Sequence, residues 1–375
     1  MPIHAPQAPC QAPAWLQAPI PLVSYGHCSR VDTVIVFITS ILIAVSAALP
    51  PILTVRYTYN LLSQLKSITK STTKSTTKST TTTPENDTPE NDEIKQAKEK
   101  ALKNWKKKAC IFAASLLAYY YFINSRASNR YRRIFRNLPI WNSYYRYLSV
   151  RLLSSSSLPP PSSQKILAVI PHGLVPYSLG LSALNSTFET FLGPLRVVAA
   201  GATKFLPGLS MLIRGIDGCS ASRDSVAEVL KQGGSPAVSP GGISEMFQGY
   251  PKKGFSPNQE VALLRNRKGF IKLSHIHNVP TIPVYVFGSS KLMRRLDVPG
   301  LEVLSRVLRA SLCVIYGRLG LPVPFRVGLT YVVGKAIYPR GTVEETHERF
   351  CEELKRIFDE FKGDYGWDRK ELVIV

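Results

Sequence analysis

A histidine and a glycine, His172 and Gly173, follow directly after the apolar, strand-type run Ile166 to Ile170 and Pro171. Imidazole is the side chain best suited to take up a proton near neutral pH. In open α/β sheets, ligands bind beyond the carboxyl ends of the strands. This placement predicts that His172 is a general base at the mouth of a buried strand. The competing interpretation is a structural histidine that is only hydrogen-bonded.

Several other kinds of catalytic site are not indicated. The sequence has no GxSxG elbow of a serine hydrolase and no HExxH zinc motif. The stretch from Gly328 to Lys335 has the wrong length for a P-loop, and Ala336 stands where Ser or Thr is needed. The six cysteines form no CxxC pair and no cysteine–histidine spacing suited to zinc. We therefore expect free thiols and no metal site.

Five further motifs follow in order along the second half of the chain. They are SRDS (Ser222–Ser225), GGISE (Gly241–Glu245), RKGF (Arg267–Phe270), IPVYVFG (Ile282–Gly288) and VVGKAI (Val332–Ile337). Together with IPHG (Ile170–Gly173), they resemble the type-2 diacylglycerol acyltransferase family, which also includes monoacylglycerol and wax-alcohol acyltransferases. The resemblance covers about residues 160–375.

The sequence departs from the family pattern in two places and differs from a group of related enzymes in a third. The family's HPHG motif begins with a histidine, and Ile170 occupies that position here. The related glycerolipid acyltransferases have an aspartate five positions after the catalytic histidine, where this chain has Tyr177. A linker rich in Ser, Thr and Lys separates two apolar segments that the family usually joins by a short hairpin. Any carboxylate that assists His172 must therefore come from elsewhere in the chain.

The resemblance implies an acyl-CoA-dependent O-acyltransferase that moves a fatty acyl group onto the free hydroxyl of diacylglycerol to make triacylglycerol. His172 would take the proton of the hydroxyl as its oxygen attacks the thioester, and Glu245 would orient the imidazole and stabilise its charged form. A surface salt bridge is the alternative role for Glu245. Acyl-CoA would be a co-substrate, and no cofactor is expected because the thioester is already activated. The alternatives are a monoacylglycerol or fatty-alcohol (wax) acyltransferase, or a catalytically silent lipid-binding relative.

Two further groups of residues have candidate roles in this reaction. Glycines let backbone N–H groups approach an oxygen that gains charge, although a tight turn explains them equally well. The candidates are Gly173, Gly241 and Gly242. Basic side chains bind the phosphates of CoA, although Arg223 has a structural alternative in local pairing. The candidates are Arg223, Arg267 and Lys268.

Alternating strand and helix signals begin near Lys165. Several of the strand segments are continuously apolar, which is typical of a sheet covered on both faces. The pattern predicts an α/β fold: a mostly parallel-sheet, acyltransferase-like domain over residues 161–375, preceded by an N-terminal membrane-associated region of one or two apolar helices. In the C-terminal helix, one apolar stripe is expected to face the core: Phe350, Leu354, Ile357, Phe358 and Phe361.

The N-terminal part of the chain contains two apolar segments. Residues 1–30 are a proline-rich tail, with part of a targeting segment as the alternative. Residues 31–55 are long enough for a transmembrane helix, and a cleaved signal peptide is the alternative. Residues 56–108, rich in Ser, Thr and Lys, are expected to be a disordered linker. Residues 109–124 form a second membrane segment candidate that spans, dips into or lies on the bilayer, with a core helix as the alternative.

Arginines and aromatic residues alternate over residues 125–160, which we expect to lie on a membrane surface, with RNA binding as the alternative. The net charge of +22 likewise indicates anionic partners. The expected partners are acyl-CoA, diacylglycerol and the membrane lipid bilayer, with no nucleic acid and a possible homo-oligomer. The expected location is the endoplasmic reticulum membrane, with the lipid droplet surface as a further site.

Overall fold

The structure is a computed structural model of the chain. It describes residues 27–78, 89–125, 127–156, 158–184, 186–247, 254–296 and 314–375, together with residues 298, 300 and 303. These residues form two compact units. The first, here called the sheet unit, comprises the described residues up to Ala44, Ala127–Thr203 and Met211–Val375. The second, the hairpin unit, comprises Val45–Arg126 and Lys204–Ser210.

A seven-stranded sheet forms the centre of the sheet unit, in the order β1-β10-β7-β2-β5-β3-β4. All neighbouring strands are parallel except β10 and β7. The α/β class is therefore confirmed, and the mostly parallel sheet is confirmed in part. The strands are β1 (Arg151–Ser154), β2 (Ile166–Ile170), β3 (Leu195–Ala199), β4 (Cys219–Ser220), β5 (Ser235–Val238), β7 (Thr281–Phe287) and β10 (Thr330–Val333).

Two small sheets accompany the central one. In the first, β6 (Gln259–Ala262) pairs in parallel with β11 (Glu371–Ile374). In the second, β8 (Arg294–Leu296) pairs antiparallel with β9 (Val314–Tyr316). Short 3-10 helices among the described residues are η2 (Gly201–Phe205, in the sheet unit up to Thr203), η3 (Ser289–Lys291) and η4 (Arg318–Gly320).

Apolar side chains fill both faces of the central sheet. Successive side chains of a strand point to opposite faces, so β2 contributes Leu167 and Val169 to one core cluster and Ile166, Ala168 and Ile170 to the other. The first cluster includes residues of α4 (Ile140–Tyr147), α5 (Tyr177–Leu181) and α6 (Ser186–Leu192). The second includes residues of α8 (Arg223–Lys231), α10 (Gly269–His277) and α12 (Val343–Phe361).

The C-terminal helix α12 shows how local sequence sets an element. Thr342 caps its first turn and Glu345 reaches back to the Thr342 backbone N–H, so the two residues form a capping box. The apolar stripe predicted for this helix is buried, which confirms that it faces the core. The described residues of the sheet unit also form α3 (Asn129–Arg136), α7 (Pro207–Gly215, from Met211 onward) and α9 (Gly242–Phe247).

Part of the segment predicted to lie on a membrane surface, 125–160, is built into the sheet unit. Its aromatic residues Trp141, Tyr144, Tyr145 and Tyr147 are buried in the core of the sheet unit, and β1 is an edge strand of the central sheet. Buried rings can neither stack on RNA bases nor lie in a lipid interface. The folded unit thus starts well before residue 161, because these rings supply core volume that the later segments lack.

The first turns of α1 (Arg30–Lys78) also belong to the sheet unit. Asp32 is buried and receives two hydrogen bonds from Arg146 of α4, at 2.9 Å from Nε and 2.5 Å from the second nitrogen. The hydroxyl of Tyr144 lies 3.0 Å from Thr39 Oγ1 and 2.9 Å from Ser40 Oγ. The predicted membrane helix therefore begins as a part of the folded unit.

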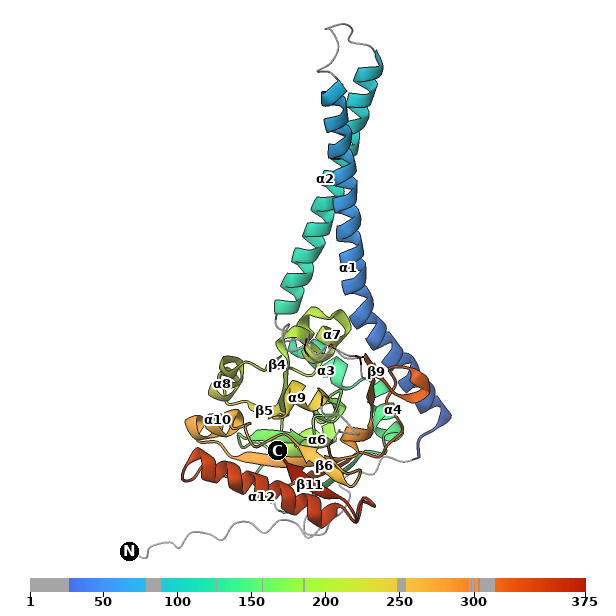
Figure 1. The fold of residues 1–375 in the computed structure, drawn as a ribbon. Helices are drawn as coiled ribbons and strands as arrows, with labels where there is room; N and C mark the ends of the chain where they lie inside the picture. The colour runs from blue at the N-terminus through green and yellow to red at the C-terminus, as the bar shows by residue number, and fades with distance from the viewer. Residues whose placement is uncertain are drawn as a thin grey trace, which may run out of the picture. The chain divides into compact units, whose positions relative to one another are not determined.

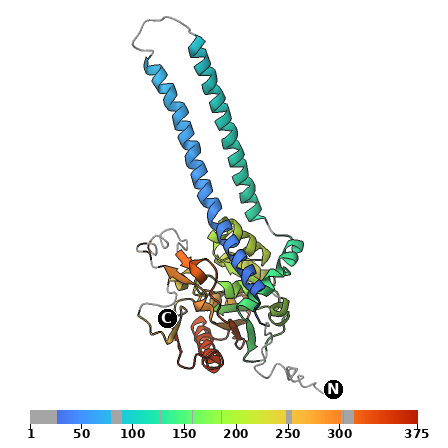
Figure 2. The ribbon, with the colours of Figure 1, turned by 90° about the vertical axis from the view of Figure 1, so that its right-hand side faces the viewer.

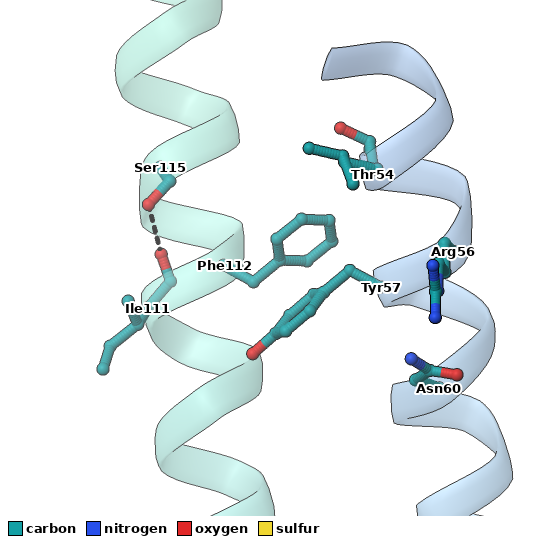
Figure 3. A pocket seen from close by; sticks show the side chains of 8 residues that line it. Thr54, Arg56, Tyr57, Asn60, Ile111, Phe112 and Ser115 are labelled. Atoms are coloured by element: carbon teal, nitrogen blue, oxygen red, sulfur yellow. Dashed lines mark hydrogen bonds between the residues drawn. The ribbon is translucent and has the colours of Figure 1, made fainter. Parts of the chain in front are cut away.

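The hairpin unit contains the rest of α1, from Val45, and α2 (Pro89–Asn124). Figures 1 and 2 show the two helices side by side and antiparallel. Tyr57 and Phe112 have ring centroids 4.9 Å apart, and the indole N–H of Trp105 donates to the carbonyl of Leu61 at 2.8 Å. Figure 3 shows Tyr57 and Phe112 reaching toward each other at the pocket between the helices.

Residues 56–108 are the range for which a disordered linker was predicted, and residues 79–88 of it lie outside the described residues. The described part of that range is helical on both sides, over residues 56–78 and 89–108. The sequence composition gave no sign of it, because the contacts that order the two helices lie between distant positions such as Trp105 and Leu61. The second apolar segment, 109–124, forms the C-terminal part of α2. How it meets a membrane stays a prediction.

Within the described ranges, one helix is long and apolar enough to cross a membrane, judged by length and composition. It is the Arg30–Thr69 part of α1, whose mean hydropathy reaches 2.3. This agrees in kind with the transmembrane helix predicted over residues 31–55. The proline-rich tail predicted over residues 1–30 lies outside the described residues up to position 26.

Candidate active site

The carboxyl ends of three neighbouring parallel strands bring the candidate residues together. β2 lies between β5 and β7, and all three run in the same direction. His172 follows β2, the turn that leads to Glu245 follows β5, and Ser289 follows β7. Neighbouring strands lie about 4.8 Å apart, so side chains at this edge are within reach of one another. The site predicted at the mouth of β2 thus has contributions from three strands.

The ring of His172 is held in one tautomer by the chain itself. Its Nδ1 lies 2.8 Å from the carbonyl oxygen of Gly173. A carbonyl oxygen can only accept, so Nδ1 carries the proton and the lone pair of Nε2 is left to act as a base. Burial lowers the pKa of His172 below its ordinary value, although the Gly173 carbonyl opposes this in part. The imidazole is therefore neutral at physiological pH, which is the state a general base requires.

Gly173 is required at its position for two reasons. Its φ is +70°, in the left-handed region that favours glycine. A Cβ at this position would also lie 2.9 Å from the carbonyl oxygen of Ser289. Only glycine allows the turn after β2 to pass this close to the loop after β7, and that approach sets the direction in which His172 leaves the strand.

Glu245 is buried beneath this turn and contacts the backbone of His172. Its Oε2 accepts a hydrogen bond from the His172 N–H at 2.5 Å, and its Oε1 accepts one from the Leu263 N–H at 3.2 Å. Burial raises the pKa of Glu245 to about 7, against the effect of these two N–H donors. The sequence-based hypothesis has Glu245 orient the imidazole directly. In the structure its carboxyl group instead positions the main chain that carries His172.

The two glycines before Glu245 have different surroundings. A Cβ on Gly241 would overlap the carboxyl group of Glu245, so Gly241 provides the space that this buried side chain fills. Gly242 has a φ of +53°, and its N–H donates to the carbonyl of Ser239 at 3.1 Å. A tight turn therefore accounts for Gly242. An oxyanion role for the backbone at Gly173, Gly241 and Gly242 stays a prediction.

Of the three basic candidates, Arg267 lies nearest to this cluster. Its guanidinium donates to Ser244 Oγ at 2.6 Å, next to Glu245, and its charge opposes the rise in the pKa of Glu245. Lys268 instead pairs with Glu344 at the start of α12, at 3.1 Å. Arg223 is the exposed first residue of α8, which follows β4. Because β4 is three strands away from β2, Arg223 is not brought next to His172.

The two substituted family positions have different environments. Ile170 is fully buried and belongs to the core cluster with Val238 and Tyr285, on the sheet face covered by α12. The position where the family has a first histidine is therefore a core position here. Tyr177, which replaces the aspartate of related enzymes, is held in surroundings that raise its pKa through burial. It remains a neutral phenol and supplies no carboxylate.

Sequence reasoning missed the serine that joins the β2 and β7 turns. Ser289 Oγ donates to the carbonyl of Pro171 at 3.2 Å and lies 3.0 Å from the hydroxyl of Ser178. Ser289 is fully enclosed and follows directly after the IPVYVFG motif. That place at the carboxyl end of a strand is the signal from which it could have been found.

No group of three or more potential metal ligands of the His, Cys, Asp and Glu types occurs among the described residues. The groups that the structure places at the carboxyl edge are a neutral imidazole, a buried carboxyl group, backbone amides and a nearby guanidinium.

Comparison with known proteins assigns the chain to a family. Residues 104–375 match the diacylglycerol acyltransferase family. The chain belongs to this family. The match confirms the resemblance found in the six motifs, and it extends upstream into α2. For a member of the diacylglycerol acyltransferase family, the reaction class is acyl transfer.

Relatives within the family differ in the acceptor that their names state. The chain is 28% identical to 2-acylglycerol O-acyltransferase 1 of Bos taurus, over 64% of this chain and 77% of that protein. It is 27% identical to acyl-CoA wax alcohol acyltransferase 2 of Mus musculus, over 69% and 84%. It is also 27% identical to diacylglycerol O-acyltransferase 1 of Saccharomyces cerevisiae, over 71% and 79%.

Among solved structures, the 1-acyl-sn-glycerophosphate (LPA) acyltransferase PlsC of Thermotoga maritima matches at 18% identity. The match covers 66% of this chain and 83% of PlsC, with a TM-score of 0.39. The assignment of this chain to the diacylglycerol acyltransferase family rests on its sequence.

Proposed function

We propose that the protein is an acyl-CoA-dependent O-acyltransferase that moves a fatty acyl group onto the free hydroxyl of diacylglycerol, with His172 as the general base. The observation that carries this proposal is the hydrogen bond from Nδ1 of His172 to the Gly173 carbonyl. It leaves Nε2 unprotonated at the carboxyl edge of the sheet, in a chain whose family performs acyl transfer.

In the proposed reaction, His172 takes a proton from the acceptor hydroxyl and later gives it to the CoA thiolate. Nε2 of His172 takes the proton of the acceptor hydroxyl as the hydroxyl oxygen forms a bond to the thioester carbonyl carbon. The carbon–sulfur bond then breaks, and the imidazolium returns the proton to the CoA thiolate. The ester and free CoA are the products. Glu245 acts as a positioning residue, since its carboxyl group holds the backbone N–H of His172 and of Leu263 at once.

The acyl-CoA is proposed to lie along the carboxyl edge of the sheet. Arg267, next to Glu245, and Arg223, at the start of α8, are the proposed phosphate-binding residues, because guanidinium groups bind phosphate in a bidentate manner. Lys268 is a weaker candidate because Glu344 already neutralises it. No cofactor is needed, because the thioester supplies an activated acyl group.

A second acceptor class is supported by the relatives. Their names include 2-acylglycerol and wax alcohol as acceptors at almost the same identity as the yeast diacylglycerol enzyme. Monoacylglycerol or a fatty alcohol is therefore the alternative acceptor for the same His172 chemistry. A catalytically silent relative is disfavoured, because the replaced position, Ile170, packs in the core.

The proposed location is the endoplasmic reticulum membrane, with access to lipid droplets. Its support is the long apolar part of α1 and the lipid acceptors named for the relatives. Homo-oligomer formation stays a prediction, and diacylglycerol and acyl-CoA are the proposed binding partners.

The decisive experiment is expression in a yeast strain that lacks its own neutral-lipid acyltransferases, followed by lipid extraction and chromatographic separation. We expect a new triacylglycerol band with the native chain and its loss with His172→Ala. The matched control is His277→Ala on α10, outside the site, which should leave the band unchanged at equal protein level. A wax ester band would change the acceptor and keep the mechanism. Full activity of His172→Ala would reject His172 as the base.

A further inference from the structure

A basic cavity of about 320 Å³ lies in the sheet unit, away from the carboxyl edge. It is lined by residues of α3, by the start of β3 and by the turn that precedes β4. Leu195 is the first residue of β3, and Asp217 precedes β4 by two positions. Because β3 and β4 run parallel to β2, this is the amino edge of the sheet. A strand of five residues is about 16 Å long, so the cavity is separated from His172 by the depth of the sheet.

Four arginines dominate the lining of this cavity: Arg132, Arg133, Arg136 and Arg196. Two carboxylates, Glu189 and Asp217, oppose them, which leaves a formal charge of +2.

The carboxylates do not satisfy all of the guanidinium groups. Asp217 lies 2.5 Å from Arg132 and 3.4 Å from Arg196, so one carboxylate is shared between two arginines. Glu189 is about half exposed and lies 3.6 Å from Arg136. Among the described residues, the buried Nε atoms of Arg132 and Arg136 have no hydrogen-bond partner. A buried donor without a partner costs free energy, which an anion in the cavity would recover.

We propose that this cavity binds the phosphate group of a phosphomonoester. A phosphomonoester carries a charge close to −2 at neutral pH, which matches the surplus charge of the lining. Its oxygens accept paired hydrogen bonds from the planar guanidinium fork, and several arginines can bind the same group from different sides. The phosphate belongs either to a lipid headgroup such as phosphatidic acid or to a soluble metabolite. The proposal goes beyond acyl transfer, because none of these residues reaches the carboxyl edge.

The test uses the full chain, purified in a neutral detergent, and calorimetric titration with two probes. The first probe is glycerol 1-phosphate, which is soluble, and the second is a short-chain phosphatidic acid, with phosphatidylcholine of the same chain length as the neutral comparison. The loss variant is Arg133→Gln with Arg136→Gln, which leaves the Asp217 pairs in place. Arg369→Gln removes an exposed arginine outside the cavity and controls for the high overall charge.

A second variant, expected to bind phosphate more tightly, keeps the test informative if the loss variant misfolds. Asp217→Asn removes the carboxylate that competes for Arg132 and Arg196, and asparagine tolerates the φ of +56° found at this position. We expect this variant to bind phosphatidic acid about threefold to tenfold more tightly. We expect the loss variant to bind at least about tenfold more weakly at an unchanged melting temperature, and Arg369→Gln to bind as the native chain does.

The outcomes separate the two sources of phosphate. Binding of phosphatidic acid without glycerol 1-phosphate identifies a lipid headgroup, and binding of both identifies a general phosphomonoester site. Equal affinity of the native chain and the folded loss variant for both probes would overturn the proposal, as would Asp217→Asn with unchanged affinity. In that case the arginines serve only to hold α3 against β3 and β4.

Discussion

At the scale of single residues, the tautomer of His172 is set by a backbone carbonyl and not by a carboxylate side chain. The Gly173 carbonyl decides which ring nitrogen carries the proton, and burial keeps the ring neutral. In this arrangement Glu245 sets the position of the main chain, while Tyr177 takes the place where related enzymes have an aspartate. The reactivity of the site therefore depends on how closely the turns after β2, β5 and β7 approach one another.

The pH dependence of acyl transfer tests the state of His172. A base acts only when unprotonated, and burial lowers the pKa of His172 below 6.5. We predict that the acid limb of the kcat/KM profile lies below pH 6.5, measured with saturating acyl-CoA and a detergent-solubilised acceptor. An acid limb at or above pH 6.5 would contradict this assignment, because it would indicate a more solvated or negatively paired imidazole.

The buried carboxyl group of Glu245 is expected to make the stability of the protein depend on pH. Its pKa is raised to about 7, so the folded state favours the protonated form more than the unfolded state does. This contribution is complete below about pH 4.5, the ordinary value, and is lost as the pH rises through about 7. Its size is on the order of 3 kcal/mol.

Glu245→Gln should remove this pH dependence, since glutamine does not ionise. We expect the stability of the native chain relative to Glu245→Gln to decrease between pH 5 and pH 8, measured as the difference between their melting temperatures. A difference that stays constant across that range would show that the pKa of Glu245 is not raised in the folded protein.

Gly173 allows a matched test of the close approach between two turns. Gly173→Ala introduces both left-handed strain and a contact with the Ser289 carbonyl. Gly233 has a similar φ of +75° with open space around it, so Gly233→Ala introduces the strain alone. We expect Gly233→Ala to cost about 1 kcal/mol of stability and to retain activity, and Gly173→Ala to cost more and to lose activity. Equal effects of the two substitutions would show that the approach to Ser289 does not matter.

At the scale of elements, the start of α1 is joined to α4 through polar contacts. Asp32 is buried and pairs with Arg146, while Tyr144 meets two hydroxyls of α1. On the other side of the same turns, Val34, Ile38 and Leu42 are exposed. The helix thus presents polar side chains, together with the apolar Val36, to protein, while other aliphatic side chains of the same turns face outward. This distribution suits a helix that is bordered by lipid.

The Asp32–Arg146 pair is therefore expected to hold α1 on the sheet unit. Asp32→Asn leaves the guanidinium of Arg146 without its carboxylate, and we expect a loss of about 2–3 kcal/mol of stability. The control is Asp359→Asn on α12, which removes an exposed pair with Lys362 and should cost less than about 0.5 kcal/mol. Chemical denaturation in detergent compares the two variants. Similar losses would mean that the buried pair contributes no more than the exposed one.

At the scale of the whole molecule, the sheet unit is discontinuous in sequence. It takes the first turns of α1 from one side of the hairpin unit and everything from Ala127 onward, apart from residues 204–210, from the other. The core residue Val36 and the partners of Tyr144 and Arg146 would be lost if the chain started after the hairpin unit. The hairpin unit is therefore an insertion between two parts of one folded unit.

This organisation predicts how truncated chains behave. A chain that starts at residue 27 keeps every contact described above and should remain monodisperse in detergent and active. A chain that starts at residue 127 exposes the α4 surface that α1 covers, and we expect it to aggregate on size-exclusion chromatography. A monodisperse and active chain starting at residue 127 would show that the first turns of α1 are dispensable for folding.

Several features of the fold and of the candidate site could be predicted from the sequence. Residue types and their order predicted His172 after a buried strand, the α/β class, the core stripe of α12 and the family. These features are local or ordered along the chain: a strand and the turn after it are contiguous, and the stripe of a helix repeats with its period. They required no knowledge of which distant segments meet.

Only the tertiary structure shows which residues distant in the sequence contact one another. Glu245 reaches the backbone of His172 across 73 positions, and Trp105 orders the hairpin unit by reaching Leu61 across 44. The basic and aromatic composition of residues 125–160 suggested a membrane surface, yet most of its rings fill the core of the sheet unit. Composition describes which surfaces a segment can cover, and only the assembled fold determines whether protein or solvent lies against them. For this chain the sequence therefore determined that a histidine follows the buried strand, whereas long-range packing determined which groups hold His172 in place.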